Sequence, residues 1–199
     1  MTSDSAIELR TFTALDAIRG DLLDVYAEAR APLLHLPNYA VTAFGERLDR
    51  HSGEPGFTAV LAYVDGRPVG YAYGNTIEFG DRYWQRTSPT PEGRYTEQPA
   101  VALKEIGVSP RWRKTGTSRR IHDALLAVRD EPYVTLMVNS AAGHGKVHDL
   151  YRSWGYGDIG QSQPSLASPV LTVMIRSTGS TGRTARRRPS APHTLRESS

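Results

Sequence analysis

Apolar residues at helical spacing dominate the start of the chain. Residues 7–12 alternate apolar and polar positions, which is typical of a short strand, and apolar residues then recur every three or four positions over 14–30. Thr13 stands where a helix cap is expected, so the pattern predicts a helix that begins just after it. Prolines then interrupt the pattern, and a second helix is expected over 42–50.

A hairpin is predicted next. The segments 57–64 and 69–78 read as strands, and the Asp65-Gly66 pair between them is typical of a two-residue turn. In the returning strand, alternation is expected to divide three residues between the two faces, with Tyr71 and Tyr73 on one face and Ala72 on the other.

The segment 79–99 breaks the regular pattern with glycines and prolines. Connections of about 20 residues are long for a compact domain, and they are usually lids, binding loops or disordered segments. Three aromatic residues in this segment, Tyr83, Trp84 and Tyr95, either line a binding pocket or pin the loop to the body. The sequence leaves both roles open.

Regular structure returns in the second half of the chain. A strand over 101–108 leads, through Pro110 and a turn of basic and small residues, into a helix over 116–129. The remaining pattern predicts a strand over 133–139, a helix over 146–154 and two strands at 158–163 and 171–176. Antiparallel strands therefore precede a strand–helix–strand unit, so the expected fold class is α/β with a mixed sheet in a single domain.

Composition narrows the possible functions. The chain has 199 residues, of which 39% are hydrophobic and 23% charged, as expected of one globular domain. It has no cysteine, which excludes a disulfide framework, a cysteine nucleophile, a zinc–thiolate site and an iron–sulfur cluster. No apolar run is long enough to cross a membrane, and the first ten residues lack the pattern of a signal peptide. We therefore expect no membrane partner and a cytoplasmic location.

Positive charge is concentrated at the end of the chain. The net charge is +3, and five arginines against one glutamate follow Arg176, so the body over 1–176 is nearly neutral. A neutral body argues against a nucleic-acid-binding domain. We expect residues 177–199, which have few large apolar side chains, to form a disordered basic tail.

The turn between the strand over 101–108 and the next helix carries the clearest chemical signal. The first amides of a helix lack partners within the helix and point outward at the positive end of its dipole, which favours a bound phosphate. Gly116 permits close approach of a ligand, and Arg113 and Lys114 add positive charge. The alternative is an ordinary solvated helix start, capped by Thr117 or Ser118.

Two segments resemble a known family. The residues Arg113-x-x-Gly116-x-Ser118 are similar to the Arg/Gln-x-x-Gly-x-Gly/Ala signature of the GNAT superfamily of N-acetyltransferases. The preceding Ile106-x-Val108-x-Pro110 matches the strand and turn of that superfamily, and Leu150-Tyr151-x-x-x-Gly155-Tyr156 resembles its final helix. The likeness follows the element order over 7–176 and is sharpest over 103–160. It implies a mostly antiparallel mixed sheet with a central, splayed parallel pair of strands, flanked by helices.

The resemblance implies acetyl-CoA as co-substrate, no metal, and direct transfer of the acetyl group to an amine of a small molecule or a protein. The pantetheine arm would pair with the backbone of Ile106, Gly107 and Val108. The diphosphate would lie on the turn, whose residues are Arg113, Lys114, Thr115, Gly116, Thr117 and Ser118. Tyr151 holds the position where this superfamily often has the acid that protonates the departing thiolate.

This chain departs from the family pattern at two places. Ser118 replaces the usual Gly or Ala, and His144 stands where the family often has an asparagine that contacts pantetheine. Asn139 is the other residue that could supply this amide. The assignment of a pantetheine contact to Asn139 or His144 therefore stays open.

Glu105, beside the expected pantetheine strand, is the best candidate for the base that deprotonates the amine. Strict alternation would place it on the same face as Leu103 and Gly107, rather than facing solvent. A water chain is the alternative base. His122 and His148 are expected at the surface, and no His, Asp or Glu set has the spacing of a metal site.

Two other classes of function remain open at this point. The chain could be a non-catalytic acyl-CoA-binding module, which needs residues 106–118 but not Tyr151 or Glu105. It could also act on a nucleic acid through its basic tail alone, although its near-neutral body disfavours this. The acceptor and the oligomeric state are not specified by the sequence, and a homodimer is compatible with it.

Overall fold

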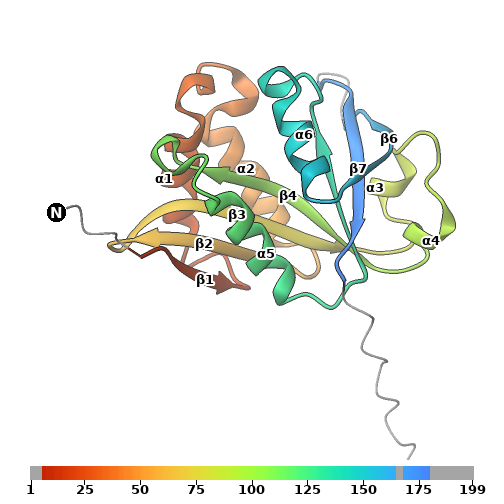
Figure 1. Cartoon of the computed structure of the whole chain (residues 1–199), viewed down its shortest axis with the longest axis horizontal. Coiled ribbons are helices and arrows are strands. Elements are labelled where there is room, and N and C mark those ends of the chain that lie inside the picture. Colours follow the sequence, from red (N-terminus) through yellow and green to blue (C-terminus); the bar gives the residue numbers. More distant parts are fainter. Residues whose placement is uncertain (1–5, 165–167, 180–199) are drawn as a thin grey trace, which may run out of the picture.

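The computed structural model describes residues 6–164 and 168–179, and across them one seven-stranded sheet organises the protein (Figure 1). The strand order is β1-β2-β3-β4-β5-β7-β6. Neighbouring strands run antiparallel except for β4 and β5, which run parallel, so the expected mixed sheet is confirmed. The strands are β1 (Glu8–Phe12), β2 (Thr58–Val64), β3 (Arg67–Ile77), β4 (Ala100–Val108), β5 (Tyr133–Val138), β6 (Gly157–Ser162) and β7 (Leu171–Ser177).

Helices cover both faces of this sheet (Figure 1). One face packs against α1 (Arg19–Arg30) and α2 (Val41–Ser52), and the other against α5 (Thr117–Ala127) and α6 (Lys146–Ser153). Two single-turn helices, α3 (Arg82–Gln85) and α4 (Gly93–Thr96), lie in the connection between β3 and β4. Short 3₁₀ turns are found at Ala31–Leu33, Pro37–Tyr39, Pro110–Trp112 and Ala142–Gly145.

The hairpin and the faces of β3 are confirmed. Asp65 and Gly66 both have positive φ, +50° and +76°, as a two-residue hairpin turn of this twist requires. Tyr71 and Tyr73 are buried against α1 and α2, whereas Ala72 is buried on the α5 face.

The expected start of the first helix was wrong. α1 begins at Arg19, and Ile18, its N-cap residue, has a non-helical backbone. Leu15 and Ile18 are buried in the core although they precede the helix, and a single turn joins them through a hydrogen bond from the Ile18 amide to the Leu15 carbonyl. Their spacing therefore reflects packing of an irregular segment, and Thr13 does not cap α1.

A β-bulge in β4 changes which residues share a face. Tyr73 pairs with Glu105, but the next residue, Gly74, pairs with Leu103, so Lys104 is an extra residue in the ladder. Leu103 consequently packs on the α5 face, while Glu105 and Gly107 lie on the α1 face, beside Tyr73 and Tyr71 respectively. The expectation that Leu103 and Glu105 share a face was wrong, because strict alternation fails at a bulge.

The connection over 79–99 is fastened to the body. Trp84 is buried, and Tyr95 packs edge-on against Tyr133 of β5, with 5.2 Å between ring centroids. The backbones of Ser88 and Gln161 exchange two hydrogen bonds of 2.8 Å, which tie the segment to β6. Trp84 and Tyr95 therefore pin the segment, which was one of the two roles left open for them.

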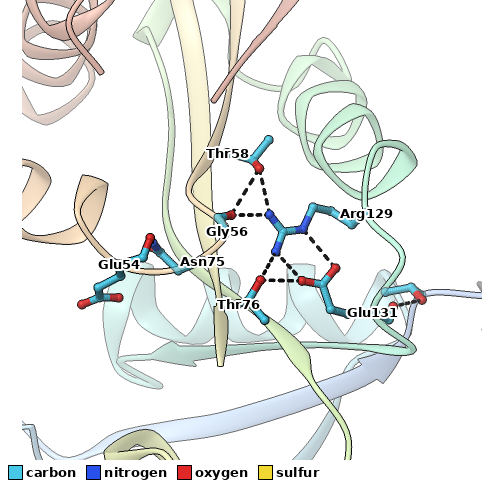
Figure 2. Close-up of polar contacts among 8 residues, drawn as sticks. Glu54, Gly56, Thr58, Asn75, Thr76, Arg129 and Glu131 are labelled. Atoms are coloured by element: carbon cyan, nitrogen blue, oxygen red, sulfur yellow. Dashed lines mark hydrogen bonds and ion pairs between the residues drawn. The ribbon is translucent and has the colours of Figure 1, made fainter. Parts of the chain in front are cut away.

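A polar brace joins β2, β3 and the connection between α5 and β5 (Figure 2). The Arg129 guanidinium donates to the carbonyl of Gly56, to the hydroxyls of Thr58 and Thr76, and to the Glu131 carboxylate. The side chains of Arg129 and Glu131 are only 6% and 11% exposed. Burial alone would raise the pKa of Glu131, but hydrogen bonds from Arg129 and Thr76 outweigh it and hold this pKa below its ordinary value.

Next to the brace, Asn75 and Thr76 of β3 hold the end of α2 and the residues that follow it. The Asn75 side-chain amide donates to the carbonyl of Glu54 at 3.4 Å (Figure 2) and to that of His51 at 2.7 Å. The backbone amide of Thr76 donates to the carbonyl of Pro55. Gly56 has a φ of +66°, and a Cβ there would lie 2.1 Å from the Thr76 hydroxyl oxygen. The chain that follows α2 is therefore held to the sheet at a position where only glycine fits.

The described part of the chain ends just after β7. Ser177 is the last residue of that strand, and the Thr178 hydroxyl donates to the carbonyl of Glu131 at 2.7 Å. The disordered tail expected at the end of the chain falls, from residue 180 onward, outside the described residues. None of the helices over 6–164 and 168–179 is long and apolar enough to span a membrane.

Candidate active site

The parallel strands β4 and β5 diverge near the middle of the sheet. Their pairing runs from Ala100 and Tyr133 to Leu103 and Leu136. β4 then continues to Val108 along β3, while β5 follows β7. The edge of β4 over 104–108 therefore has no partner strand on the β5 side. Ile106, Gly107 and Val108 lie on this edge, so their backbone is free to pair with a pantetheine arm, as the family resemblance implies.

The turn that follows β4 leads to an uncapped helix. Gly116 is the N-cap residue of α5, with a φ of +82°, and no side chain caps the helix. A Cβ at Gly116 would meet nothing within 4 Å, so the space in front of the first amides is open. Lys114 also has positive φ, at +63°. Unpaired amides, an open cradle and the positive end of the helix dipole suit a diphosphate.

Side chains of this turn make local contacts. Arg113 donates to the carbonyl of Ala29 at 2.7 Å, and so fastens the turn to the last turn of α1. The hydroxyls of Thr115 and Thr117 lie 2.7 Å apart, and Thr117 is buried. The interior of the turn is thus lined by backbone and small side chains, while Lys114 is exposed.

Asn139 and His144 belong to the connection between β5 and α6. The Asn139 side-chain carbonyl accepts a hydrogen bond of 3.0 Å from the Ala141 amide, so it stabilises the loop itself. His144 is exposed and has a φ of +57°. Both residues therefore stay candidates for the pantetheine contact.

The two candidate catalytic residues, Tyr151 of α6 and Glu105 of β4, are near enough for the Glu105 carboxylate to act electrostatically on the Tyr151 phenol. Tyr151 is 7% exposed and packs edge-on against Trp154 and Tyr156. Burial raises the pKa of Tyr151 above its ordinary value, and the nearby Glu105 carboxylate raises it further. The phenol is therefore protonated at neutral pH, as a proton donor must be.

Arg30, at the end of α1, is a site residue that sequence reasoning missed. Its guanidinium donates to the Glu105 carboxylate at 3.0 Å and to the carbonyl of Ile106 at 3.4 Å. Burial lowers the pKa of Arg30, but the Glu105 carboxylate outweighs this and raises it above the ordinary value. Arg30 thus keeps its charge beside Glu105. The two residues are 75 positions apart, and no local pattern links them.

Tyrosines surround this ion pair. The pKa values of Tyr71 and Tyr73 lie well above their ordinary range because both phenols are buried and Glu105 is near. The Tyr71 hydroxyl is buried without a hydrogen-bond partner in the described part of the chain. Tyr71 also packs against Gly107, where a Cβ would lie 2.7 Å from the ring, so this position of β4 requires glycine.

A cleft of about 870 Å³ opens beside Glu105. Residues 103–105 of β4 and Met137 of β5 line it, and α2 and α3 contribute the other sides. Within it, a ring nitrogen of His51 lies 3.2 Å from the Tyr73 hydroxyl. Burial and the nearby Lys104 lower the pKa of His51 to about 4, so the imidazole is neutral at pH 7. Tyr83 both lines this cleft and lies 3.0 Å from the Thr135 hydroxyl, so it combines the two roles left open for it.

The two histidines expected at the surface are not equivalent. His122 is completely buried, and its Nε2 lies 2.8 Å from the Tyr156 hydroxyl, so that expectation was wrong. His148 is partly buried and pairs with Asp158 at 2.9 Å. Over the described residues, no group of three or more His, Asp or Glu side chains could hold a metal ion.

Comparison with solved structures identifies the fold. Ard1 from Thermoplasma volcanium is 20% identical, with a TM-score of 0.56 over 86% of this chain and 97% of that one. The ribosomal-protein-S18-alanine N-acetyltransferase of Escherichia coli is 14% identical, with a TM-score of 0.60, and the match covers 90% of this chain and 99% of that one. An aminoglycoside 6'-N-acetyltransferase solved with coenzyme A is 15% identical, with a TM-score of 0.57, and the match covers 86% of this chain and 97% of that one. At these identities, the likeness establishes the fold alone.

The sequence itself matches a family model. A search of curated proteins finds no significant match. The model of the acetyltransferase (GNAT) family, however, matches residues 21–156. This range begins at Asp21, in the first turn of α1, and ends at Tyr156, three residues after α6. It includes the diverging strands β4 and β5 and the turn before α5. The chain therefore belongs to the GNAT family of acetyltransferases.

Proposed function

We propose that this protein transfers an acetyl group from acetyl-CoA directly to an amine in a ternary complex. The observation that carries the proposal is the free edge of β4 beyond Leu103, which leads straight to the uncapped amides and open Gly116 of α5. The free edge of β4 suits the amides of the pantetheine arm, and the start of α5 suits the diphosphate. Acetyl-CoA would supply the activated thioester at the end of the path nearest Glu105 and Tyr151.

In this proposal, Ile106, Gly107 and Val108 hold the pantetheine arm through their backbone. Residues 113–118 hold the diphosphate, mainly through amides, with charge from Lys114. Asn139 and His144 are the candidates for a side-chain contact with pantetheine. The domain that does this spans 1–176, its location is cytoplasmic, and a homodimer is compatible with it.

The chemistry follows from the site residues. An amine attacks the thioester carbonyl only as the free base, so a proton must leave it first. Glu105 would accept that proton, directly or through water, while Arg30 keeps its carboxylate in place. As the new C–N bond forms and the C–S bond breaks, the Tyr151 phenol would donate its proton to the sulfur. A module that only bound acyl-CoA would have no use for a base at Glu105 or for an acid at Tyr151.

Calorimetric titration with acetyl-CoA and with CoA tests the proposed diphosphate site at residues 113–118. Gly116→Trp should abolish binding, because its side chain would fill the open space before α5. Gly66→Trp is the matched control, since Gly66 also has positive φ and open space around its Cβ but lies in the β2–β3 hairpin. Equal affinity of the Gly116→Trp variant and the wild type would refute the placement, whereas binding without turnover of any amine would favour the non-catalytic module.

A further inference from the structure

The cleft beside Glu105 carries an excess of positive charge. Among its lining residues are five cationic side chains and three carboxylates. Two of the carboxylates are already paired, Glu54 with Lys104 at 2.8 Å and Glu105 with Arg30. The third, Asp81, accepts a hydrogen bond of 2.7 Å from the Tyr83 amide, so it also serves as the cap of α3.

Three arginines of the cleft are left without partners. Arg50 comes from α2, and Arg82 and Arg86 come from α3 and its C-cap, on another wall of the cleft. Their guanidinium groups make no hydrogen bond or ion pair within residues 6–164 and 168–179, in contrast to Arg47, which donates to the carbonyls of Asn38 and Ala43. Planar guanidinium groups with free donors suit carboxylate and phosphate ligands.

A buried hydroxyl stands in the wall of the same cleft. Ser162 of β6 lines the same cleft and is 3% exposed, yet its hydroxyl has no hydrogen-bond partner in the part of the chain that the structure describes. Because this oxygen has almost no accessible surface, it does not itself reach a ligand in the cleft, and the case for an anion site rests on the arginines.

We propose that the acceptor is a small amine that also carries a carboxylate or phosphate group. Arg50, Arg82 and Arg86 would bind its anionic end, while its amine end lies near Glu105 at the divergence of β4 and β5. The inference rests on the proposed function and specifies its substrate class. A volume of about 870 Å³ is of the size that holds a small molecule. The cationic walls disfavour polyamines, which bring only like charge.

Four matched primary amines test this selectivity: 4-aminobutanoate, 3-aminopropyl phosphate, butylamine and 1,4-diaminobutane. With saturating acetyl-CoA, release of free thiol gives kcat and KM for each. We expect both anionic amines to exceed butylamine in kcat/KM, mainly through a lower KM, and 1,4-diaminobutane to be the poorest. The ranking of the carboxylate against the phosphate identifies which anion the arginines prefer.

The triple variant R50Q/R82Q/R86Q ties the selectivity to these side chains. Three exposed charge pairs together account for about tenfold in affinity, so the preference for 4-aminobutanoate over butylamine should fall by about that factor. Arg67→Gln is the control, because Arg67 is an exposed arginine at the start of β3, outside the cleft.

The outcomes separate the two proposals. A preference for butylamine or 1,4-diaminobutane, or an unchanged preference in the triple variant, would overturn the inference and leave acetyl transfer intact. Tight CoA binding without turnover of any of the four amines would overturn the inferred substrate class, and absence of turnover with peptide amines as well would overturn the proposed function.

Discussion

Removing Arg129 should destabilise the protein far more than removing an exposed arginine. In Arg129→Met, a side chain of similar length replaces the guanidinium, so the packing changes little. Glu131, whose side chain is 11% exposed, then loses its charged partner, and the carbonyl of Gly56 loses a donor. Thr76 still donates to Glu131 at 2.8 Å, so that carboxylate keeps one side-chain donor.

The size of the effect follows from the burial. Breaking a buried ion pair by removing one partner typically costs about 3–5 kcal/mol. Glu131 can limit this cost by taking up a proton, which from its ordinary pKa of 4.5 requires about 3.4 kcal/mol at pH 7. We therefore expect a loss of about 3 kcal/mol in the free energy of unfolding at pH 7, and a drop of roughly 6–12 °C in Tm.

Urea titrations at pH 7 and pH 5 provide the assay. Because protonation of Glu131 becomes easier at the lower pH, the loss should shrink by roughly 2 kcal/mol between the two conditions. The double variant R129M/E131Q should recover most of the stability, since it leaves no buried charge. Arg94→Met, which breaks a pair that is 61% and 67% exposed, is the control and should cost at most about 1 kcal/mol. A loss below 1 kcal/mol in Arg129→Met, or one that is equal at both pH values, would refute the reasoning.

Three further predictions concern the site. Tyr151→Phe should lower kcat at least about tenfold with little change in acetyl-CoA affinity, because only the proton donor is removed; stopped-flow turnover and calorimetry measure the two quantities, and a wild-type kcat would exclude the acid role. Glu105→Gln should alter the pH–rate profile, and an unaltered profile would point to a water chain as the base. His51 has a folded pKa of about 4, below its ordinary 6.5, so the unfolded state binds more protons between these values. Stability should thus be complete above pH 6.5 and decrease as the pH falls towards 4, and His51→Gln should weaken this slope in denaturant titrations; an unchanged slope would exclude His51 as its source.

Local patterns were sufficient for much of the fold. The hairpin turn at Asp65-Gly66 and the faces of β3 followed from the conformational demands of the turn and from alternation. The turn before α5 followed from Pro110, which ends the strand, and from Gly116, which precedes the helix. The order of the main strands and helices followed from the spacing of apolar residues. These features depend on neighbours in sequence, which is why the sequence specifies them directly.

Features that depend on distant neighbours were missed. The bulge at Lys104 reversed the face of Glu105 relative to Leu103, and no residue in β4 marks the extra position. Arg30 reaches Glu105 only because α1 crosses the sheet at that place. His122 lies between charged residues in sequence, yet it is buried because Tyr156 offers a hydrogen-bond partner at 2.8 Å. In each case, tertiary packing decided the outcome.

The brace around Arg129 has a consequence for the kinetics of folding. It links residues 73 positions apart and joins the end of α5 to the β2–β3 hairpin, so it is a long-range contact. Contacts that form after the rate-limiting step contribute nothing to the speed of folding and slow the reverse reaction instead. We expect the brace to close after that step, so that Arg129→Met would speed unfolding and leave the folding rate unchanged.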